Sequence, residues 1–421
     1  MTTQQLRIPA PSAAPDPGAS VRRTRNAALA GAWLATRALM LFLLVDDSIG
    51  VGGVTGEVYV LYRQWYDQLI TGHFPYGDAT WQYPPGAGLV ILAPALLPFL
   101  TFFQAFVALT LAADALVALA LVRAGARAGG SAAGAWLWVG GLPLLLHLPY
   151  GRYDVLVTAS AVAALLCLRR GPRLGGALAG LGALVKVWPA LTLLGTPRGR
   201  STRAAWTAAL GSALALLGVL ALGFTHTLDF LRQQGSRGVQ IESLGGTALQ
   251  LAHLLADWPG RVVYRYGAME FTGPYVSSVA ALALALTGAA FCWLLVWRVR
   301  ARRWTAATPA DAALCAVLLF TVTSRVISPQ YLIWLLGLAA VCLTSRHTCQ
   351  RPVALLLLPT AALSALVFPT LYDQVMAGTA AGTALMVVRN SLLLTAALLS
   401  GRRLWTATAA GPVRRAGREN A

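Results

Sequence analysis

The sequence is poor in charged residues. Only 11% of its 421 residues are charged, whereas 57% are hydrophobic, and the mean hydropathy is +0.64. A soluble domain normally carries about a quarter charged residues, so a soluble protein of this length is excluded. The composition predicts an all-α, polytopic integral membrane protein with about 10–12 transmembrane or re-entrant helical segments.

The motifs that hold nucleotides or metals, or that carry a serine nucleophile, in soluble enzymes are missing. The sequence has no P-loop, no G-x-G-x-x-G after a strand, no H-E-x-x-H and no G-x-S-x-G. Its five histidines lie far apart, and its five cysteines show no metal-ligand spacing. We therefore expect no cofactor and no metal site.

Positive charge is plentiful but unevenly distributed. The net charge is +18, and Lys186 is the only lysine, so almost every strong cation is an arginine. The arginines fall in short clusters between apolar runs, as the positive-inside rule predicts for cytosolic loops. This distribution argues against nucleic-acid binding. The clusters lie at 22–25, 123–127, 169–173, 198–203, 298–303 and 402–418.

The arginine clusters also restrict the topology. If every apolar segment crossed the membrane, the clusters at 123–127 and 169–173 would lie outside, against the rule. They become cytosolic if segments 86–103 and 174–195 re-enter instead. Both segments are interrupted by proline, and broken helices survive at membrane depth where they line a cavity in the protein.

This topology predicts a multi-pass protein of the plasma membrane, with both termini cytosolic and two long outward loops. Most of its acidic residues then face outward, so any active site is expected on the extracytoplasmic side. Residues 1–27 are expected to be a disordered cytosolic N-terminus. Residues 28–400 form one transmembrane domain with outward loops at about 46–85 and 224–275, and 401–421 form a basic cytosolic tail.

The first outward loop contains several acids beside a predicted helix. Apolar and aromatic residues recur at helical spacing from Glu57 to Leu69, which predicts an amphipathic helix lying in the membrane interface. Carboxylates partly removed from water can serve as general bases. The helix alone is better explained as an ordinary amphipathic connector, and the acids beside it favour a functional role.

Lys186 and Arg325 are candidate anion ligands. Lys186 lies in the apolar stretch "GLGALVKVWPALTLL", where an unpaired ammonium is costly, so it either snorkels to the headgroups or holds a phosphate or carboxylate. Arg325 lies in "SRVISPQYLIW" and can bind such a group through its forked guanidinium. Arg37 and Asp114 lie within spans and are expected to neutralise each other.

Four stretches together resemble a known family. They are "GEVYVLYRQWYDQLITGHFPYGDATWQYPPGAG", "GRYDVLV", "GLGALVKVWPALTLL" and "SPQYLIW". In this order they resemble the GT-C class of polytopic glycosyltransferases, and within it glycosyltransferase family 87, the polyprenyl-phosphate-mannose-dependent mannosyltransferases of actinobacteria. The resemblance implies an inverting hexosyl transfer from a polyprenyl-phosphate sugar to a glycolipid or glycan acceptor outside the cell, among membrane lipids and without nucleic acid.

The family pattern places an acid in the first outward loop as catalytic base. The matching position is Glu57, where the family usually has Asp, and Asp47 and Asp46 remain alternatives. Candidate ligands of the donor phosphate are Lys186, Arg325 and Arg63. Candidate sugar or acceptor contacts are Tyr62, Tyr76, Asp78, Trp81, Gln82, Tyr83, Arg152, Asp154, Gln330 and Tyr331.

Two other functions remain open from the sequence. A secondary transporter or lipid flippase would usually show repeated halves with ionisable residues at the membrane midplane. Here the acids collect in the loops and no internal repeat is visible. A non-catalytic membrane scaffold is the third possibility, because glutamate replaces the usual aspartate at position 57.

Overall fold

The computed structural model describes residues 17–50, 53–233 and 237–409. Most of these residues are helical and the few strands form one small sheet, so the predicted all-α class is confirmed. Within these ranges, six helices are long and apolar enough to cross a membrane. They are α1 (Pro17–Asp46), α4 (Phe102–Gly125), α8 (Arg200–Gly223), α11 (Val276–Arg300), α14 (Arg351–Ala365), which the turn η7 (Leu366–Thr370) extends, and α16 (Ala380–Thr408).

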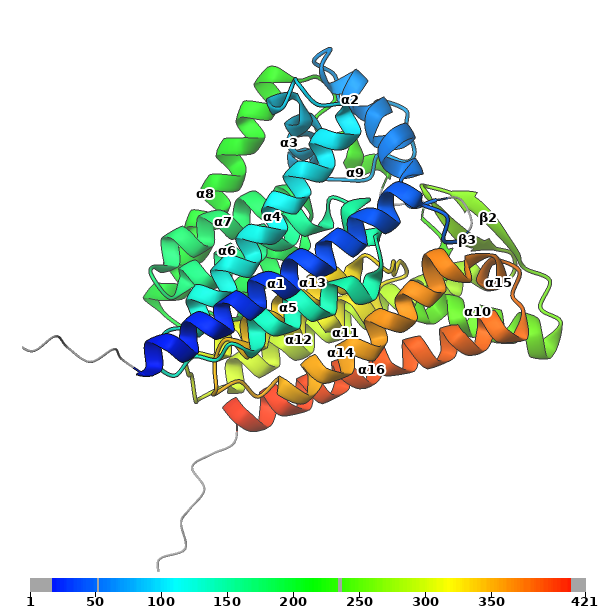
Figure 1. Ribbon diagram of the computed structural model, residues 1–421. Helices are drawn as coiled ribbons and strands as arrows, with labels where there is room; N and C mark the ends of the chain where they lie inside the picture. Colours follow the sequence, from blue (N-terminus) through cyan, green and yellow to red (C-terminus); the bar gives the residue numbers. More distant parts are fainter. Residues whose placement is uncertain (1–16, 51–52, 234–236, 410–421) are drawn as a thin grey trace, which may run out of the picture.

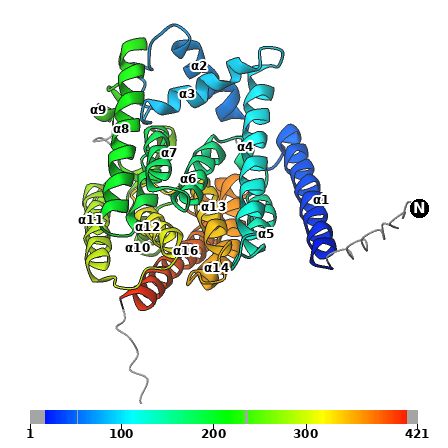
Figure 2. The same ribbon diagram turned by 90° about the vertical axis from the view of Figure 1, so that its left-hand side faces the viewer.

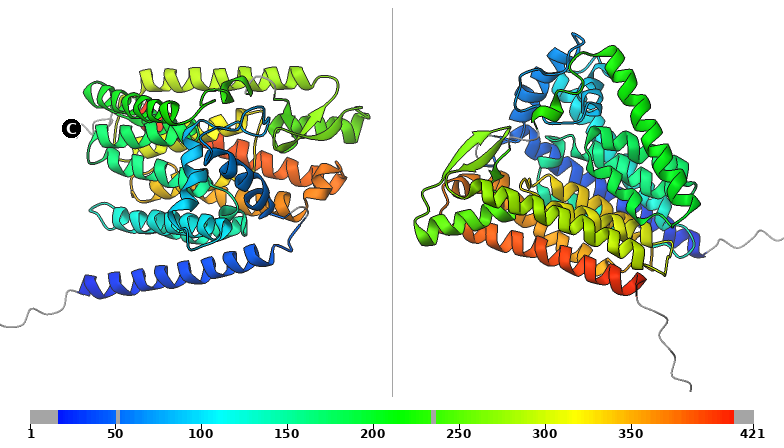
Figure 3. Two further views of the ribbon diagram at one scale, coloured as in Figure 1. Left: turned by 90° about the horizontal axis from the view of Figure 1, so that it is seen from above. Right: turned by 180° about the vertical axis from the view of Figure 1, so that it is seen from behind.

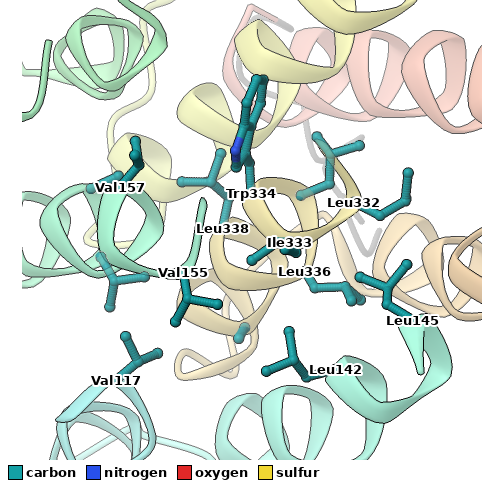
Figure 4. Close-up of a cluster of buried hydrophobic side chains, with 14 of the residues drawn as sticks. Val117, Leu142, Leu145, Val155, Val157, Leu332, Ile333, Trp334, Leu336 and Leu338 are labelled. Atoms are coloured by element: carbon teal, nitrogen blue, oxygen red, sulfur yellow. The ribbon is translucent and has the colours of Figure 1, made fainter. Parts of the chain in front are cut away.

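Shorter helices fill the interior of the bundle. Every residue of α13 (Tyr331–Leu343) after Tyr331 is buried, as expected of a helix that is apolar around its whole circumference. Figure 4 shows side chains of α13 surrounded by those of α4, η3 (Leu142–Leu145) and α6 (Asp154–Leu168), among them Val117, Leu142 and Val155. The shorter helices of the bundle are α5 (Ala133–Gly141), η3 (Leu142–Leu145), η4 (Leu148–Tyr150), α6 (Asp154–Leu168), α7 (Pro172–Val185), α12 (Thr308–Thr323) and α13 (Tyr331–Leu343).

Two long helices form opposite edges of the bundle. Figures 2 and 3 show α1 along one side and α11 along the other. The side chains of Leu282, Leu284 and Leu295 on α11 are exposed. Exposed apolar side chains along a helix of spanning length are expected to contact lipid.

The basic clusters gather at one end of the bundle. The described ends of the chain, at the start of α1 and the end of α16, both lie there (Figure 1). Backbone hydrogen bonds join neighbouring turns at this end, from Ser131 N to Thr344 O (3.0 Å) and from Arg302 N to Thr408 O (2.9 Å). The two long loops lie at the opposite end of the bundle. The positive-inside rule predicts that such basic clusters lie on the cytosolic side of a membrane.

Residues 172–195 enter the bundle and return to the same end. α7 rises from the basic end to Val185, Lys186 is extended at the apex, and η5 (Trp188–Gly195) leads back. Near the end of η5, the Leu194 carbonyl accepts a hydrogen bond from Arg298, which lies in the last turn of α11. Glycines on α7 allow close packing on α8, since a Cβ at Gly176 would lie 2.1 Å from the Ala205 carbonyl oxygen.

Residues 86–101 also turn back, at the loop end. α3 (Gly86–Leu92) starts against the backbone of Leu184, close to the apex of the re-entrant segment. η2 (Ala93–Leu96) follows, and α4 then begins at Phe102. The Phe102 ring packs on Tyr66 of the first loop, with 5.1 Å between ring centroids. The segment therefore begins and ends beside that loop, as its prolines and short length predicted.

The first loop contains the predicted interfacial helix. A π-helical turn, η1 (Glu57–Tyr62), runs directly into α2 (Arg63–Leu69). Val58, Tyr62, Trp65 and Leu69 are buried on one face of this helix. The chain leaves the helix at Gly72, whose φ of +83° favours glycine.

The second loop folds into a structure that the sequence did not indicate. β1 (Val239–Gln240), β3 (Ala268–Thr272) and β2 (Arg261–Arg265) form an antiparallel sheet in the order β1-β3-β2. The helices α9 (Phe230–Gln233), α10 (Leu244–Ala256) and α15 (Tyr372–Met376) complete this end of the molecule. Two-residue and five-residue strands carry too little alternation to be recognised from sequence.

Two expected boundaries are wrong. α1 begins at Pro17, so residues 17–27 are helical and not disordered; residues 1–16 lie outside the described residues. α16 continues to Thr408, so the basic tail expected from residue 401 begins as helix, and 410–421 again lie outside the described residues.

A buried ion pair fixes α1 to α4. The Arg37 guanidinium donates to both carboxylate oxygens of Asp114, at 2.7 and 2.9 Å. The same carboxylate accepts hydrogen bonds from the Trp33, Trp138 and Tyr150 side chains. The expected neutralisation is thus confirmed, and the charge is fully hydrogen-bonded inside the bundle, where an unpaired ion is costly.

We predict that Asp114→Ala destabilises the fold, because it leaves the Arg37 guanidinium buried without a counter-ion. Breaking a buried pair from one side costs about 3–5 kcal/mol. The free energy of unfolding of the purified protein in detergent micelles measures this loss. Asp67→Ala is the matched control, since Asp67 forms an exposed pair with Arg63. Equal stability of the two variants would contradict the structural role of Asp114.

Candidate functional site

A cavity of about 690 Å³ opens at the loop end of the bundle. It lies where the two long loops meet the apex of the re-entrant segment. Segments far apart in the sequence supply its walls. They are 53–61 and 80–84 of the first loop, Arg152, residues 186–188, residues 237–242 and 264–269 of the second loop, and residues 326–334.

Glu57 and Arg152 form an ion pair on one wall. The Glu57 carboxylate, at the start of η1, lies 2.7 Å from the Arg152 guanidinium and keeps 23% of its side-chain surface exposed. Arg152 also donates to the carbonyls of Val54 (3.1 Å) and Gly151 (2.8 Å), which ties the first loop to the turn before α6. Burial alone would lower the pKa of Arg152, but the neighbouring Glu57 charge raises it overall. Arg152 therefore stays charged.

Lys186 and Asp154 form a second, more deeply buried pair. The Lys186 ammonium lies 2.5 Å from the Asp154 carboxylate, which also accepts from the Trp334 indole N–H at 2.6 Å. The ammonium faces the rings of Tyr153 at 4.7 Å, Trp334 at 5.0 Å and Tyr83 at 5.6 Å. Asp154 is the first residue of α6, where the helix dipole favours an anion. These contacts compensate the cost of burying the ammonium of Lys186, the chain's only lysine, at the apex of the re-entrant segment.

Asp46 and Asp47, the alternative candidates for the catalytic base, make contacts outside the cavity. Asp47 accepts hydrogen bonds from the backbone of Val54 (2.9 Å) and Thr55 (3.1 Å) and from His147 (3.0 Å), and so shapes the first loop. Burial raises the pKa of Asp47, but these bonds and that of the Thr55 hydroxyl outweigh it, and the net pKa falls. Asp46 is exposed and bonds to Ser48. Both acids lie outside the cavity.

The expected phosphate ligands are spread over different places. Lys186 lines the cavity, whereas Arg63 is half-exposed and pairs with Asp67 outside it. Arg325 lies beside the cavity wall, where its carbonyl accepts from the Gln240 backbone. The cavity also contains Arg237, which is 3.3 Å from Glu270 and was not among the expected ligands.

The expected sugar contacts fall into three groups. Gln82, Tyr83, Arg152, Gln330 and Tyr331 line the cavity. A second group, formed by Tyr62, Trp81 and Asp154, is buried behind the wall. The last two lie elsewhere: Tyr76 is exposed against His226, and Asp78 accepts from Trp65 and Thr80 and thereby caps its turn.

Aromatic rings support the wall formed by residues 80–84. Trp65 packs edge-to-face on Trp81 (5.0 Å between centroids) and on Tyr83 (5.7 Å). Tyr83 in turn packs edge-to-face on Tyr153 at 5.3 Å. Such contacts add stability beyond area burial and hold rings in fixed orientations. The rings therefore place Tyr83 against both the cavity and the Lys186 ammonium.

Sequence reasoning missed the contribution of the second loop. Gln240, Glu242, Tyr264 and Arg237 all line the cavity. Burial raises the pKa of Glu242 to about 7, although the Arg389 and Arg152 charges act against it. Sequence spacing gave no signal for these residues, because the sheet that positions them joins segments about 30 residues apart.

Three carboxylate–cation pairs and several aromatic rings lie at the cavity. Carboxylates accept protons, cations stabilise anionic leaving groups, and rings stack on sugars. Among the described residues, no group of three or more His, Cys, Asp or Glu side chains lies close enough to hold a metal ion. The arrangement suits a transfer reaction driven by a base and by fixed positive charge.

Comparison with known proteins agrees with this geometry. The model of glycosyltransferase family 87 matches residues 81–329, more than half of the chain. The match includes Arg152, Lys186, Arg237 and Glu242 of the cavity, together with Asp154 behind its wall, and begins after Glu57. No curated protein matches the chain. The protein belongs to glycosyltransferase family 87 and is a membrane glycosyltransferase.

Proposed function

We propose that the protein transfers a mannosyl or other hexosyl group from a polyprenyl-phosphate donor to a glycolipid or glycan acceptor on the extracytoplasmic side. The observation that carries this proposal is the cavity at the loop end, where one partly exposed carboxylate, Glu57, shares the space with Lys186 and Arg237. A base and fixed cations are what a sugar-phosphate donor requires.

Glu57 serves as the base in this proposal. The acceptor hydroxyl gives its proton to Glu57, and its oxygen forms the new bond to the anomeric carbon from the face opposite the phosphate. The phosphate leaves with the electrons of the broken C–O bond, so the anomeric configuration inverts. A phosphate is a stable anion, so no general acid is needed, whereas glycosidases need two carboxyl groups.

Lys186 and Arg237 are proposed to hold the donor phosphate. Both line the cavity, and each has a carboxylate partner, Asp154 or Glu270, that fixes its position. A pre-positioned cation stabilises the charge that develops on the phosphate without reorganising during the reaction. Arg325 contributes positive charge from behind the wall, whereas Arg63 is left out because it faces away from the cavity.

Apolar side chains at the cavity support a donor that enters from the membrane. Val60, Val187 and Leu231 line the cavity and are 68%, 66% and 59% exposed. Exposed apolar side chains around a polar site favour a lipid-linked substrate, because the prenyl chain remains among acyl chains while its headgroup reaches the cations. A soluble sugar nucleotide has no such requirement.

The distribution of arginine supports an extracytoplasmic site. The helix ends and turns that carry the basic clusters lie at the end of the bundle opposite the two long loops (Figure 1), whose residues line the cavity. The positive-inside rule assigns that end, with both termini, to the cytosol of a cell with a plasma membrane. The acceptor is then a component of the cell envelope.

We predict that Glu57→Gln lowers transfer from labelled polyprenyl-phosphate-mannose about 10²–10⁴-fold, the usual contribution of a general base. Glutamine has the same size but accepts no proton. Transfer to membrane acceptors by the purified, reconstituted protein measures the effect.

Two variants complete this experiment. Glu57→Asp keeps the charge beside Arg152 and should retain measurable transfer, which separates a lost base from a lost fold. Asp67→Asn, in the same loop but outside the cavity, should behave as wild type. Undiminished transfer by Glu57→Gln would show that another group is the base.

A second prediction separates the two roles of Lys186. Lys186→Met leaves the Asp154 carboxylate buried without its cation and should cost about 3–5 kcal/mol of unfolding free energy. The double variant Lys186→Met with Asp154→Asn removes both charges and should recover most of that loss. Transfer should stay low in both variants, because the donor phosphate has lost its ligand. Wild-type transfer by the double variant would make Lys186 purely structural.

A further inference from the structure

Glu242 is a second carboxylate in the same cavity. It follows β1 in the second loop and is 2% exposed. Its carboxylate accepts a hydrogen bond from the Gln240 side chain. Its own carbonyl accepts from the Asn390 amide of α16 at 3.3 Å, which anchors the loop to the bundle. Glu242 is therefore held in a fixed place, but too deeply to be the main contact of a substrate.

Charged groups reach Glu242 from several elements. Arg389 of α16 acts on it most strongly, and Arg152 acts on it from the turn before α6. The phenols of Tyr331 on α13 and Tyr372 on α15 also interact electrostatically with it. Gln240 is its neutral hydrogen-bond partner. Glu242 thus interacts electrostatically with the same guanidinium that pairs with Glu57.

Arg152 lines the same cavity as the two carboxylates, Glu57 and Glu242. It forms an ion pair with Glu57 at 2.7 Å and has an electrostatic interaction with Glu242. Its Nε is buried and has no hydrogen-bond partner among the described residues. One guanidinium, with a buried N–H group that has no partner, therefore acts on the charges of both acids. The more strongly one acid attracts Arg152, the less Arg152 stabilises the other.

Burial raises the pKa of Glu242 to about 7, although Arg389 and Arg152 act against this rise. Below this pH the side chain is mostly neutral and leaves Arg152 to Glu57. Above it, the side chain is mostly ionised and competes for the guanidinium. The charge on Glu242 consequently changes in the range where a cell works.

We propose that Glu242 is a positioning residue that controls how tightly Arg152 holds Glu57. An ionised Glu242 draws on the Arg152 charge and leaves the Glu57 carboxylate freer to accept the acceptor hydroxyl's proton. A neutral Glu242 leaves Glu57 bound to Arg152 and less able to act. The catalytic part of this inference rests on the proposed role of Glu57, whereas the coupling of the two acids through Arg152 does not.

The coupling is measured without turnover. The chain contains four glutamates, so full-length protein with carboxyl-labelled glutamate in nanodiscs gives few infrared carboxyl bands. The band that is lost in Glu242→Gln belongs to Glu242. Its titration is expected to have a midpoint at about pH 7. In Glu57→Gln, Arg152 is free to act on Glu242, so this midpoint should fall. In an Arg152→Gln background, the same Glu57 substitution should shift the midpoint less.

Glu270→Gln is the matched control. Glu270 is also a buried glutamate of the second loop, but it pairs with Arg237. Its substitution should remove one band and leave the Glu242 midpoint in place. An unchanged Glu242 midpoint in Glu57→Gln, or an equal shift with and without Arg152, would overturn the proposal.

The consequence for catalysis appears in the pH profile. Transfer from polyprenyl-phosphate-mannose by wild type should rise between about pH 6 and 8. The profile of Glu242→Gln should lack this rise, Glu242→Asp should restore it, and Glu270→Gln should lower the rate without changing the profile. A wild-type rise that persists in Glu242→Gln would contradict the proposal. A wild type that leaves the donor unchanged would contradict the proposed function, while the infrared titration still decides the coupling.

Discussion

The ion pair between Lys186 and Asp154 joins the apex of the re-entrant segment to the start of α6. Lys186 lies at the apex of a segment that enters the bundle and turns back, and its extended backbone cannot continue a helix. Inside a membrane protein, a broken helix and a buried ammonium are both costly unless protein groups satisfy them. Asp154, Trp334 and the rings of Tyr83 and Tyr153 provide that compensation. These contacts therefore hold the apex of the re-entrant segment, with Lys186, at the cavity.

The other charges of the cavity are also compensated by groups of the protein. Arg152 is paired with Glu57 and Arg237 with Glu270, so the site is charged but close to neutral as a whole. Such pairing keeps the groups oriented in the absence of substrate. In the proposed function, the donor phosphate competes with these carboxylates for the cations. It would bind where charge is already organised, and a neutral compound would gain little there.

Much of the fold followed from the sequence, because membrane insertion leaves clear signals. The arginine clusters and the prolines of residues 86–103 and 174–195 predicted the two segments that turn back. Helical spacing predicted the helix that begins at Glu57 and ends at Leu69. The small sheet of the second loop was missed, since its strands are too short for a periodic pattern.

The candidate site was less predictable. Lys186 was noticed because it is the only lysine, but its partner Asp154 lies 32 residues away and no spacing rule joins them. Arg63 was expected in the site, yet it follows Glu57 by about one and two-thirds helical turns and so lies on another face. Glu242 and Arg237 reach the cavity only through the tertiary fold. Spacing can assign residues to a face of one helix, but not to a cavity built from several segments.

The central claim is that the cavity at the loop end binds a lipid-linked sugar phosphate. Its most direct test is a structure, by electron cryomicroscopy, of the Glu57→Gln protein in nanodiscs with polyprenyl-phosphate-mannose. The account predicts the phosphate against Lys186 and Arg237, the anomeric carbon facing residue 57, and the prenyl chain leaving past Val187. An empty cavity, with the donor instead in the apolar groove between α11 and α16 at the basic end, would contradict it.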